Sequence, residues 1–151
     1  MAQFTVRALK TNELAAAWPI VRSSNLHANL DWWLTAGAKL IAGDGGVLVA
    51  VAQDGTIHGV ATFKAPDNPA MDNALEIPML ITFELSSRAP ARNALVKVLE
   101  RIATKLECTH VVLPLAGNFS ASRPYVELRR LRKQSVPAML ALDRSGHLSR
   151  L

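Results

Sequence analysis

The sequence predicts an α/β (α+β) protein folded as a single domain over residues 1–151, and three observations support that prediction. The spacing of apolar residues changes along the chain between a period of about two, typical of strands, and one of about 3.6, typical of helices. An Asp-Gly pair separates the apolar runs 47–52 and 56–63, which indicates a β-hairpin. Residues 75–115 follow the order strand, helix, strand, which makes those two strands parallel.

The N-terminal third begins with a strand and continues with two helices. Apolar and polar residues alternate over residues 4–9, as expected for a strand. Thr11 or Asn12 is then expected to cap a helix, and Pro19 is expected to kink it. A second helix is predicted over residues 30–42, because its apolar residues recur at helical spacing and a glycine-rich stretch follows it.

The second half of the chain contains the parallel unit. Residues 75–85 are predicted to form a largely buried strand, since most of them are apolar. A helix begins within residues 86–90, and its apolar residues fall at i, i+3, i+4 and i+7. The elements predicted after it are a strand over 110–115, a short helix over 121–128, and a strand pair over 131–135 and 138–143.

Composition limits the class of protein. No apolar run reaches the ~20 residues that span a bilayer, and the first residues carry charges where a signal peptide would be apolar. We therefore expect a soluble cytoplasmic protein without a membrane partner. The single cysteine, Cys108, cannot form an internal disulfide, and the histidines lack metal-ligand spacing, so no metal is expected.

The charge of the chain favours an anionic partner. The net charge is +5, which suits a phosphorylated cofactor, a nucleic acid or an ordinary solvated surface. A basic run late in the chain could bind a phosphate of a coenzyme or of a nucleic acid, or could protect a strand edge. Because few aromatic residues accompany the run, nucleic acid is the less favoured partner. The run consists of Arg129, Arg130, Arg132 and Lys133.

The start of the helix at residues 86–93 is the segment best suited to bind an anion. The first N–H groups of a helix have no partner within it, and the helix dipole places positive potential there. Arg88 and Arg92 would strengthen that potential. Alternatively, Ser87 only caps the helix and both arginines are solvated.

The order of the elements and two short patterns resemble the GNAT superfamily of N-acetyltransferases over nearly the whole chain. Arg88-Ala89-Pro90-Ala91-Arg92-Asn93 resembles the family motif of Gln or Arg, two residues, Gly, one residue, and Gly or Ala, with both glycines replaced here. The segment from Asn118 to Tyr125 resembles the family pattern of Asn, two residues, Ala, three residues and Tyr. The resemblance implies a mixed, mostly antiparallel sheet of six or seven strands with flanking helices, and acetyl-coenzyme A as cosubstrate.

The resemblance also implies which residues bind the coenzyme. The two parallel strands would splay near residues 81–83 and 113–115, so that backbone groups there pair with the amides of the pantetheine arm. Pro78 and Pro114 fit strands that are imperfectly paired, but they could equally mark strand edges or bulges without a ligand. The residues implied for coenzyme binding are Ile81, Phe83, Arg88, Ala89, Ala91, Arg92, Asn93 and Asn118.

Catalytic roles follow from the same resemblance. Tyr125 would protonate the departing thiolate of coenzyme A, or its ring could simply pack at a helix end. Acyl transfer to an amine requires a base, for which Glu76 and Glu84 are the candidates, with Glu76 slightly favoured. Either carboxylate could instead be a surface group, and His58 is a weaker candidate for the base.

Three functions remain open from the sequence alone. The resemblance favours transfer of an acetyl group from acetyl-coenzyme A to a primary amine of a small molecule or peptide, by direct attack. The replaced glycines leave open a catalytically impaired GNAT-like coenzyme-binding or interaction module, and the charge leaves open a basic nucleic-acid-binding domain. Exposed strand edges are compatible with a homodimer. The acceptor cannot be predicted, because loops such as 65–73 would shape its pocket.

Overall fold

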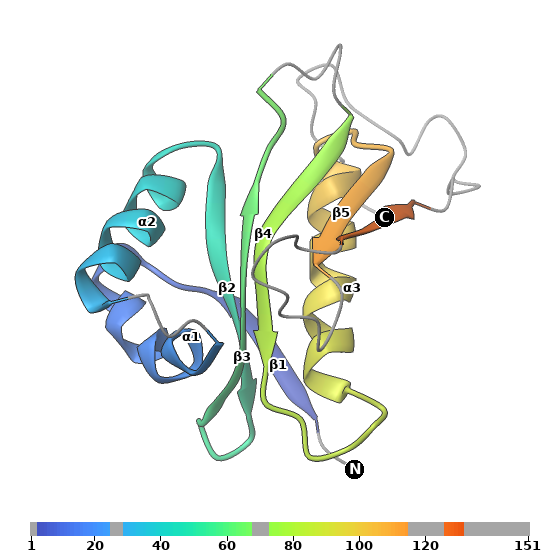
Figure 1. Ribbon diagram of the computed structural model, residues 1–151. Coiled ribbons are helices and arrows are strands. Elements are labelled where there is room, and N and C mark those ends of the chain that lie inside the picture. The colour runs from blue at the N-terminus through green and yellow to red at the C-terminus, as the bar shows by residue number, and fades with distance from the viewer. Residues whose placement is uncertain (1–2, 25–28, 68–72, 115–125, 132–151) are drawn as a thin grey trace.

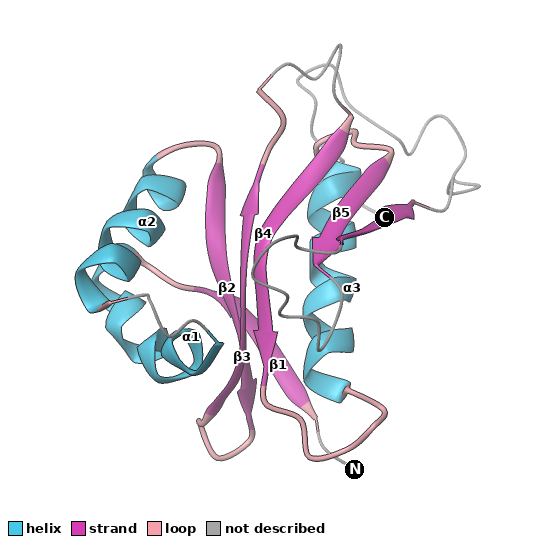
Figure 2. Ribbon diagram, viewed as in Figure 1, coloured by secondary structure: helices cyan, strands magenta, loops and turns pink. Residues whose placement is uncertain are grey.

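The computed structural model describes residues 3–24, 29–67, 73–114 and 126–131 of the chain. The elements follow one another in an order close to the predicted one (Figures 1 and 2). They are β1 (Phe4–Ala8), the 3-10 helix η1 (Thr11–Ala17), α1 (Trp18–Ser24), α2 (Leu30–Ala42), β2 (Gly45–Ala52), β3 (Ile57–Lys64), β4 (Ala74–Thr82), α3 (Pro90–Lys105), β5 (His110–Pro114) and β6 (Val126–Arg130).

The strands form one mixed sheet in the order β1-β2-β3-β4-β5-β6. Every neighbouring pair is antiparallel except β4 and β5, which are parallel because α3 forms the crossover between them. Within the described residues the sheet has six strands, so the predicted mixed and mostly antiparallel sheet is confirmed.

Helices cover both faces of the sheet, and each face has its own core (Figure 1). On one face, η1, α1 and α2 bury residues such as Leu14 and Trp33 against β2 and β3. On the other face, α3 buries Leu95 and Leu99 against the middle of the sheet, and Cys108 packs into the same cluster. The sheet is therefore a central layer between two helical layers.

The predicted N-terminal helix is divided in two. Residues Thr11–Ala17 form a 3-10 helix, and the α-helix begins only at Trp18, next to Pro19, the residue at which the sequence predicts a kink. The predicted cap at Thr11 or Asn12 is wrong, because Lys10 is the N-cap residue. Its backbone N–H donates to Glu13 Oε1 at 2.9 Å, which is the contact that the N3 carboxylate of a capping box makes with the N-cap backbone.

The predicted hairpin is confirmed, and a second glycine lets α3 lie close to it. Gly55, in the turn, has a φ of +88°, which residues with a side chain rarely adopt. In β3, a Cβ added at Gly59 would lie 2.9 Å from both Leu95 Cδ1 and Thr82 Cγ2. The absence of a side chain at Gly59 therefore allows α3 to pack tightly beside the end of β4.

The prediction that a helix continues through residues 126–128 is wrong. These residues lie in β6, which pairs antiparallel with β5 from His110 to Pro114. Pairing satisfies the backbone groups along that edge of β5, which a helix would leave without partners. The predicted strands over 131–135 and 138–143 lie outside the described residues, apart from Leu131.

None of the helices in the described ranges combines the length and apolar character needed to cross a bilayer.

The buried indole of Trp33 offers a direct test of the helical layer. Its Nε1 donates to the backbone oxygen of Leu14 at 2.7 Å, and its side chain is 1% exposed. Trp33→Phe should lower the free energy of unfolding by about 2–3 kcal/mol, because it leaves a cavity and a buried carbonyl without its donor. The matched control Trp32→Phe, at a position 43% exposed, should change it by less than about 0.5 kcal/mol. Urea denaturation would measure both, and equal losses would contradict this packing.

Candidate active site

Strands β4 and β5 separate soon after they pair. Their parallel register covers only three positions, Ala74 with His110, Leu75 with Val111 and Glu76 with Val112. Beyond Glu76, β4 continues to Thr82 without β5 beside it, whereas its other edge stays paired with β3. The predicted splaying of the two parallel strands is therefore confirmed. We call this region the β4–β5 divergence, meaning β4 residues 77–82 and β5 residues 113–114.

A bulge in β4 lies at the start of the divergence. In the pairing of β3 with β4, Lys64 faces Glu76 and Thr62 faces Met79, so one residue of β3 opposes two of β4. Pro78 is one of those two, and it has no N–H to donate to a neighbouring strand. Pro78 thus lies at a bulge in the pairing of β4 with β3, which is one of the alternatives that the sequence leaves open for it.

The register shows which backbone groups of β4 face the divergence. The N–H of Phe83 donates to the backbone oxygen of His58 in β3 at 2.7 Å. Because backbone direction alternates along a strand, Ile81 also directs its N–H and C=O toward β3. The expectation that Ile81 and Phe83 offer these groups to a ligand is therefore corrected. Leu80 and Thr82 are the residues whose backbone groups point to the other side, where none of the described strands pairs with β4 beyond Glu76.

The start of α3 is already occupied by a carboxylate. Glu84 accepts hydrogen bonds from the backbone N–H of Ala91 at 3.2 Å and of Arg92 at 2.8 Å. The N-cap residue Ala89 has a left-handed backbone (φ 50°, ψ 57°) and no side-chain group that could cap the helix. Glu84 thus takes the role considered for Ser87, and the amides expected to be free for a phosphate have an anionic partner.

The turn before α3 is further held by short-range hydrogen bonds. Ser86 Oγ accepts from the N–H of Arg88 at 3.1 Å, and Asn93 Nδ2 donates to the oxygen of Arg88 at 2.8 Å. The N–H of Asn93 donates to Ala89 within the first turn of the helix. The side chain of Arg88 is exposed at this turn. Of the predicted phosphate ligands, Arg88 is therefore the one best placed to meet a ligand without rearrangement.

Arg92 connects α3 to the far side of the divergence. Its Nη2 donates to the backbone oxygen of Pro114 at 3.0 Å, at the end of β5. A guanidinium can hold a carbonyl and an anion at once, because it carries five N–H groups. Arg92 is thus positioned by the end of β5 as well as by its own helix.

The two candidate bases lie in different surroundings. Glu76 occupies the last position at which β4 and β5 pair, so it stands where the strands part. It is exposed and lies between Leu75 and Ile77, which are buried on the α3 side, so it projects from the face covered by α1 and α2. The Glu84 carboxylate, by contrast, already accepts two hydrogen bonds from backbone amides at the start of α3, away from the point where β4 and β5 part.

Of the remaining predicted site residues, the structure describes His58 but not Asn118 or Tyr125. Asn118 and Tyr125 lie outside the described residues, so their roles remain predictions. His58 lies between two phenylalanine rings, with centroids 5.2 Å from Phe4 and 5.9 Å from Phe83. Within the described ranges, no group of three His, Cys, Asp or Glu side chains is arranged to hold a metal ion.

Comparisons with known proteins identify the fold. No protein-family model matches the sequence, and no curated protein matches it significantly. Solved structures do match. YncA from Salmonella typhimurium, with its cofactor acetyl-CoA, superimposes with a TM-score of 0.60 at 16% identity, covering 89% of this chain and 98% of that one. An acetyltransferase of the GNAT family from Staphylococcus aureus Mu50 gives 0.59 at 10% identity, with 75% and 73% covered.

A third match is an antibiotic-modifying enzyme. The aminoglycoside 6'-N-acetyltransferase AAC(6')-Ih from Acinetobacter baumannii gives a TM-score of 0.61 at 13% identity, covering 72% of this chain and 77% of that one. At identities this low, the superpositions establish a shared architecture and say nothing of a shared chemistry. With its parallel β4–α3–β5 unit and parted strands, the chain has the fold of the GNAT acetyltransferases.

Proposed function

We propose that the chain binds acetyl-coenzyme A along the β4–β5 divergence and transfers the acetyl group to a primary amine. The observation that carries the proposal is the separation of two parallel strands after Glu76 and Val112, with a helix start following the longer strand. Support comes from YncA, a protein of the same fold whose structure contains acetyl-CoA.

The divergence fits the pantetheine arm of the coenzyme. Leu80 and Thr82 direct backbone N–H and C=O groups to the unpaired side of β4, and amides of an extended ligand can pair with such groups as a strand would. When bound, acetyl-coenzyme A supplies the thioester carbonyl that an amine attacks. The backbone of β4 holds the arm, and the site at Glu76 receives the reacting end.

Glu76 is the residue that we assign as the base. An amine must lose a proton to attack a carbonyl, and a carboxylate can take it directly or through water. The new C–N bond replaces the C–S bond, and the departing thiolate takes up a proton, for which Tyr125 remains the predicted donor. Glu76 fits its role because it stands at the parting of the strands and projects from the face opposite α3.

The diphosphate of the coenzyme has to compete with Glu84. The amides of Ala91 and Arg92 are the ones that a helix start would offer to a phosphate, and the Glu84 carboxylate holds both. A diphosphate carries more negative charge than a carboxylate and can also reach the exposed Arg88. Coenzyme binding therefore requires the segment that carries Glu84 to move away from α3.

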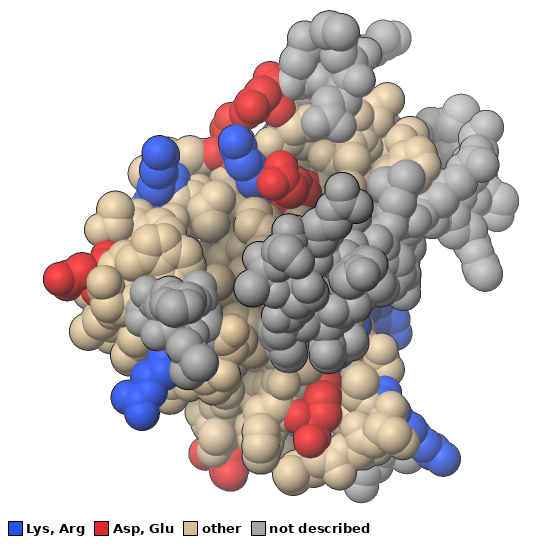
Figure 3. Space-filling model, in the orientation of Figure 1, with Lys and Arg blue, Asp and Glu red and all other residues tan. Residues whose placement is uncertain are grey.

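The same contact favours a second candidate function. If Glu84 keeps the amides of α3 permanently, the chain is a GNAT-like module that has lost its coenzyme and acts through other surfaces. The nucleic-acid alternative has less support. On the face shown in Figure 3, basic and acidic side chains are dispersed among each other, and the described residues on that face form no single basic patch.

Replacing Glu84 separates these possibilities. Glu84→Ala frees the amides of Ala91 and Arg92, so the affinity for acetyl-coenzyme A should rise about tenfold, because two charge-assisted hydrogen bonds no longer have to be broken. Affinity for pantetheine, which lacks the diphosphate, should not change. Isothermal titration calorimetry would measure both, with Glu107→Ala at the other end of α3 as the control for net charge.

The outcomes have distinct meanings. Equal strengthening of pantetheine and coenzyme binding would contradict the placement of the diphosphate at α3. Absence of coenzyme binding by both the parent protein and Glu84→Ala would exclude the acetyltransferase proposal and favour the second candidate.

Glu76→Gln tests the assignment of the base. The variant should lower kcat by about 100-fold with little change in the Kd for acetyl-coenzyme A, because the amide cannot accept the proton from the amine. Raising the pH should restore part of the rate, since more of the amine is then neutral. Release of thiol from coenzyme A with a panel of primary amines would report turnover, with Glu107→Gln as the control. An unchanged kcat would remove Glu76 from the mechanism.

A further inference from the structure

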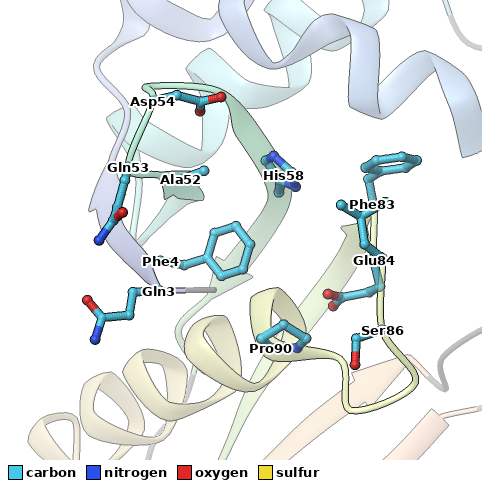
Figure 4. Close-up of a pocket in the computed structure, with 11 residues that line it drawn as sticks. Gln3, Phe4, Ala52, Gln53, Asp54, His58, Phe83, Glu84, Ser86 and Pro90 are labelled. Carbon is cyan, nitrogen blue, oxygen red and sulfur yellow. The ribbon is translucent and has the colours of Figure 1, made fainter. Parts of the chain in front are cut away.

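A cavity of about 370 Å³ lies beside the start of α3, apart from the β4–β5 divergence. Its walls come from four places: the beginning of β1, the β2–β3 hairpin, the segment that follows β4, and Pro90 (Figure 4). Among the described residues that line it, none belongs to β5. Glu84 and Pro90 adjoin the helix start proposed for the diphosphate, but none of the described lining residues belongs to the β4–β5 divergence, where the pantetheine arm is proposed to lie.

Three rings form a row along the cavity. Phe4 and His58 have their centroids 5.2 Å apart at an interplanar angle of 55°, and His58 and Phe83 have theirs 5.9 Å apart at 51°. The rings are tilted and not stacked face to face, and Phe83 is 56% exposed, so part of its ring surface is accessible. Leu85, two residues further on, is 83% exposed. The cavity thus presents apolar and aromatic surface to a ligand, although such surface is usually buried.

The charged groups around the cavity are acidic. Asp54 lies at its rim and Glu84 directs its carboxylate inward, near Pro90 (Figure 4). Neither lysine nor arginine occurs among the described lining residues, although the chain as a whole carries a net charge of +5. The backbone N–H of Thr56 donates to Asp54 Oδ1 at 2.9 Å and lowers the pKa of that carboxyl. The cavity is therefore an acidic site in a basic protein.

We propose that this cavity binds an organic cation, a protonated or quaternary amine that carries apolar groups. Ring faces attract cations, and aromatic side chains combined with carboxylates are the usual means of binding alkylammonium groups. The cation would lie against the rings of His58 and Phe83, within the field of Glu84 and Asp54, and its apolar part would cover Phe83 and Leu85. A ligand anion finds no cationic side chain among the described residues that line the cavity. Binding of a cation in this cavity requires no coenzyme, so the proposal can be tested independently of acetyl transfer.

A matched pair of small molecules tests the chemistry of the site. Choline serves as the probe, and 3,3-dimethylbutanol, which has the same shape without the charge, serves as its control. Choline should bind saturably and shift the amide NMR signals of His58 and Phe83, whereas 3,3-dimethylbutanol should bind at least about tenfold more weakly. Equal binding of the two compounds, or the absence of saturable shifts at His58 and Phe83, would overturn the proposal.

Two variants of lining residues and one control variant test the location of the site. Phe83→Ala should weaken choline binding about fivefold to tenfold, because it removes the most exposed ring of the row. Asp54→Asn should weaken it as well, by removing a charge. Trp32→Ala, which truncates an exposed aromatic residue of α2 that does not line this cavity, should leave it unchanged. Because Phe83 is largely exposed, the variant should keep the circular dichroism of the parent protein. Equal effects of Phe83→Ala and Trp32→Ala would overturn the proposal.

Discussion

The parting of β4 and β5 after three paired positions is the constraint from which the rest of the site follows. Parallel strands need a crossover connection, and α3 is that connection between β4 and β5. The start of this long helix therefore lies shortly after the end of β4. The bulge at Pro78 interrupts the pairing of β4 with β3, and the register beyond it directs the backbone groups of Leu80 and Thr82 away from β3, to the side where no described strand pairs with them. Backbone groups without a strand partner are costly when buried, so this edge favours an extended polar ligand.

Glu84 provides a partner for backbone groups at the other end of the site, where the first amides of α3 would otherwise lack one. A helix that begins at Pro90 after a left-handed Ala89 has no side chain at its N-cap to accept hydrogen bonds, and Glu84 fills that gap from outside the helix. The contact stabilises α3 in the absence of a ligand, and it places an anion where a diphosphate would otherwise lie. Loss of the two motif glycines and gain of this carboxylate thus act in the same direction. Both would make the proposed coenzyme binding more costly, and the carboxylate also places negative charge at the neighbouring cavity.

Much of the fold could be predicted from sequence, and the failures have physical causes. The Asp-Gly turn, the amphipathic helix of residues 90–105 and the strand, helix, strand order depend on local periodicity, which the sequence displays directly. Which residues of β4 face the divergence depends on the bulge at Pro78 and on register with β3, both non-local. The contact of Glu84 with Ala91 and Arg92 joins residues seven and eight positions apart across a turn, so local periodicity does not show it. The sequence signal that could indicate it is a helix start without a capping side chain at Ala89 and with a glutamate a few residues before it. Strand β6 forms because β5 has an edge to pair, a feature of the assembled sheet.

The most direct test of this account is a map of backbone amide NMR shifts during titration with acetyl-coenzyme A. The largest changes should fall on Thr82, whose amide faces the β4–β5 divergence, and on Ala91 and Arg92, whose amides exchange a carboxylate partner for a phosphate. Saturation with the coenzyme that leaves these three signals unmoved would contradict the proposal that the β4–β5 divergence and the start of α3 form one binding site.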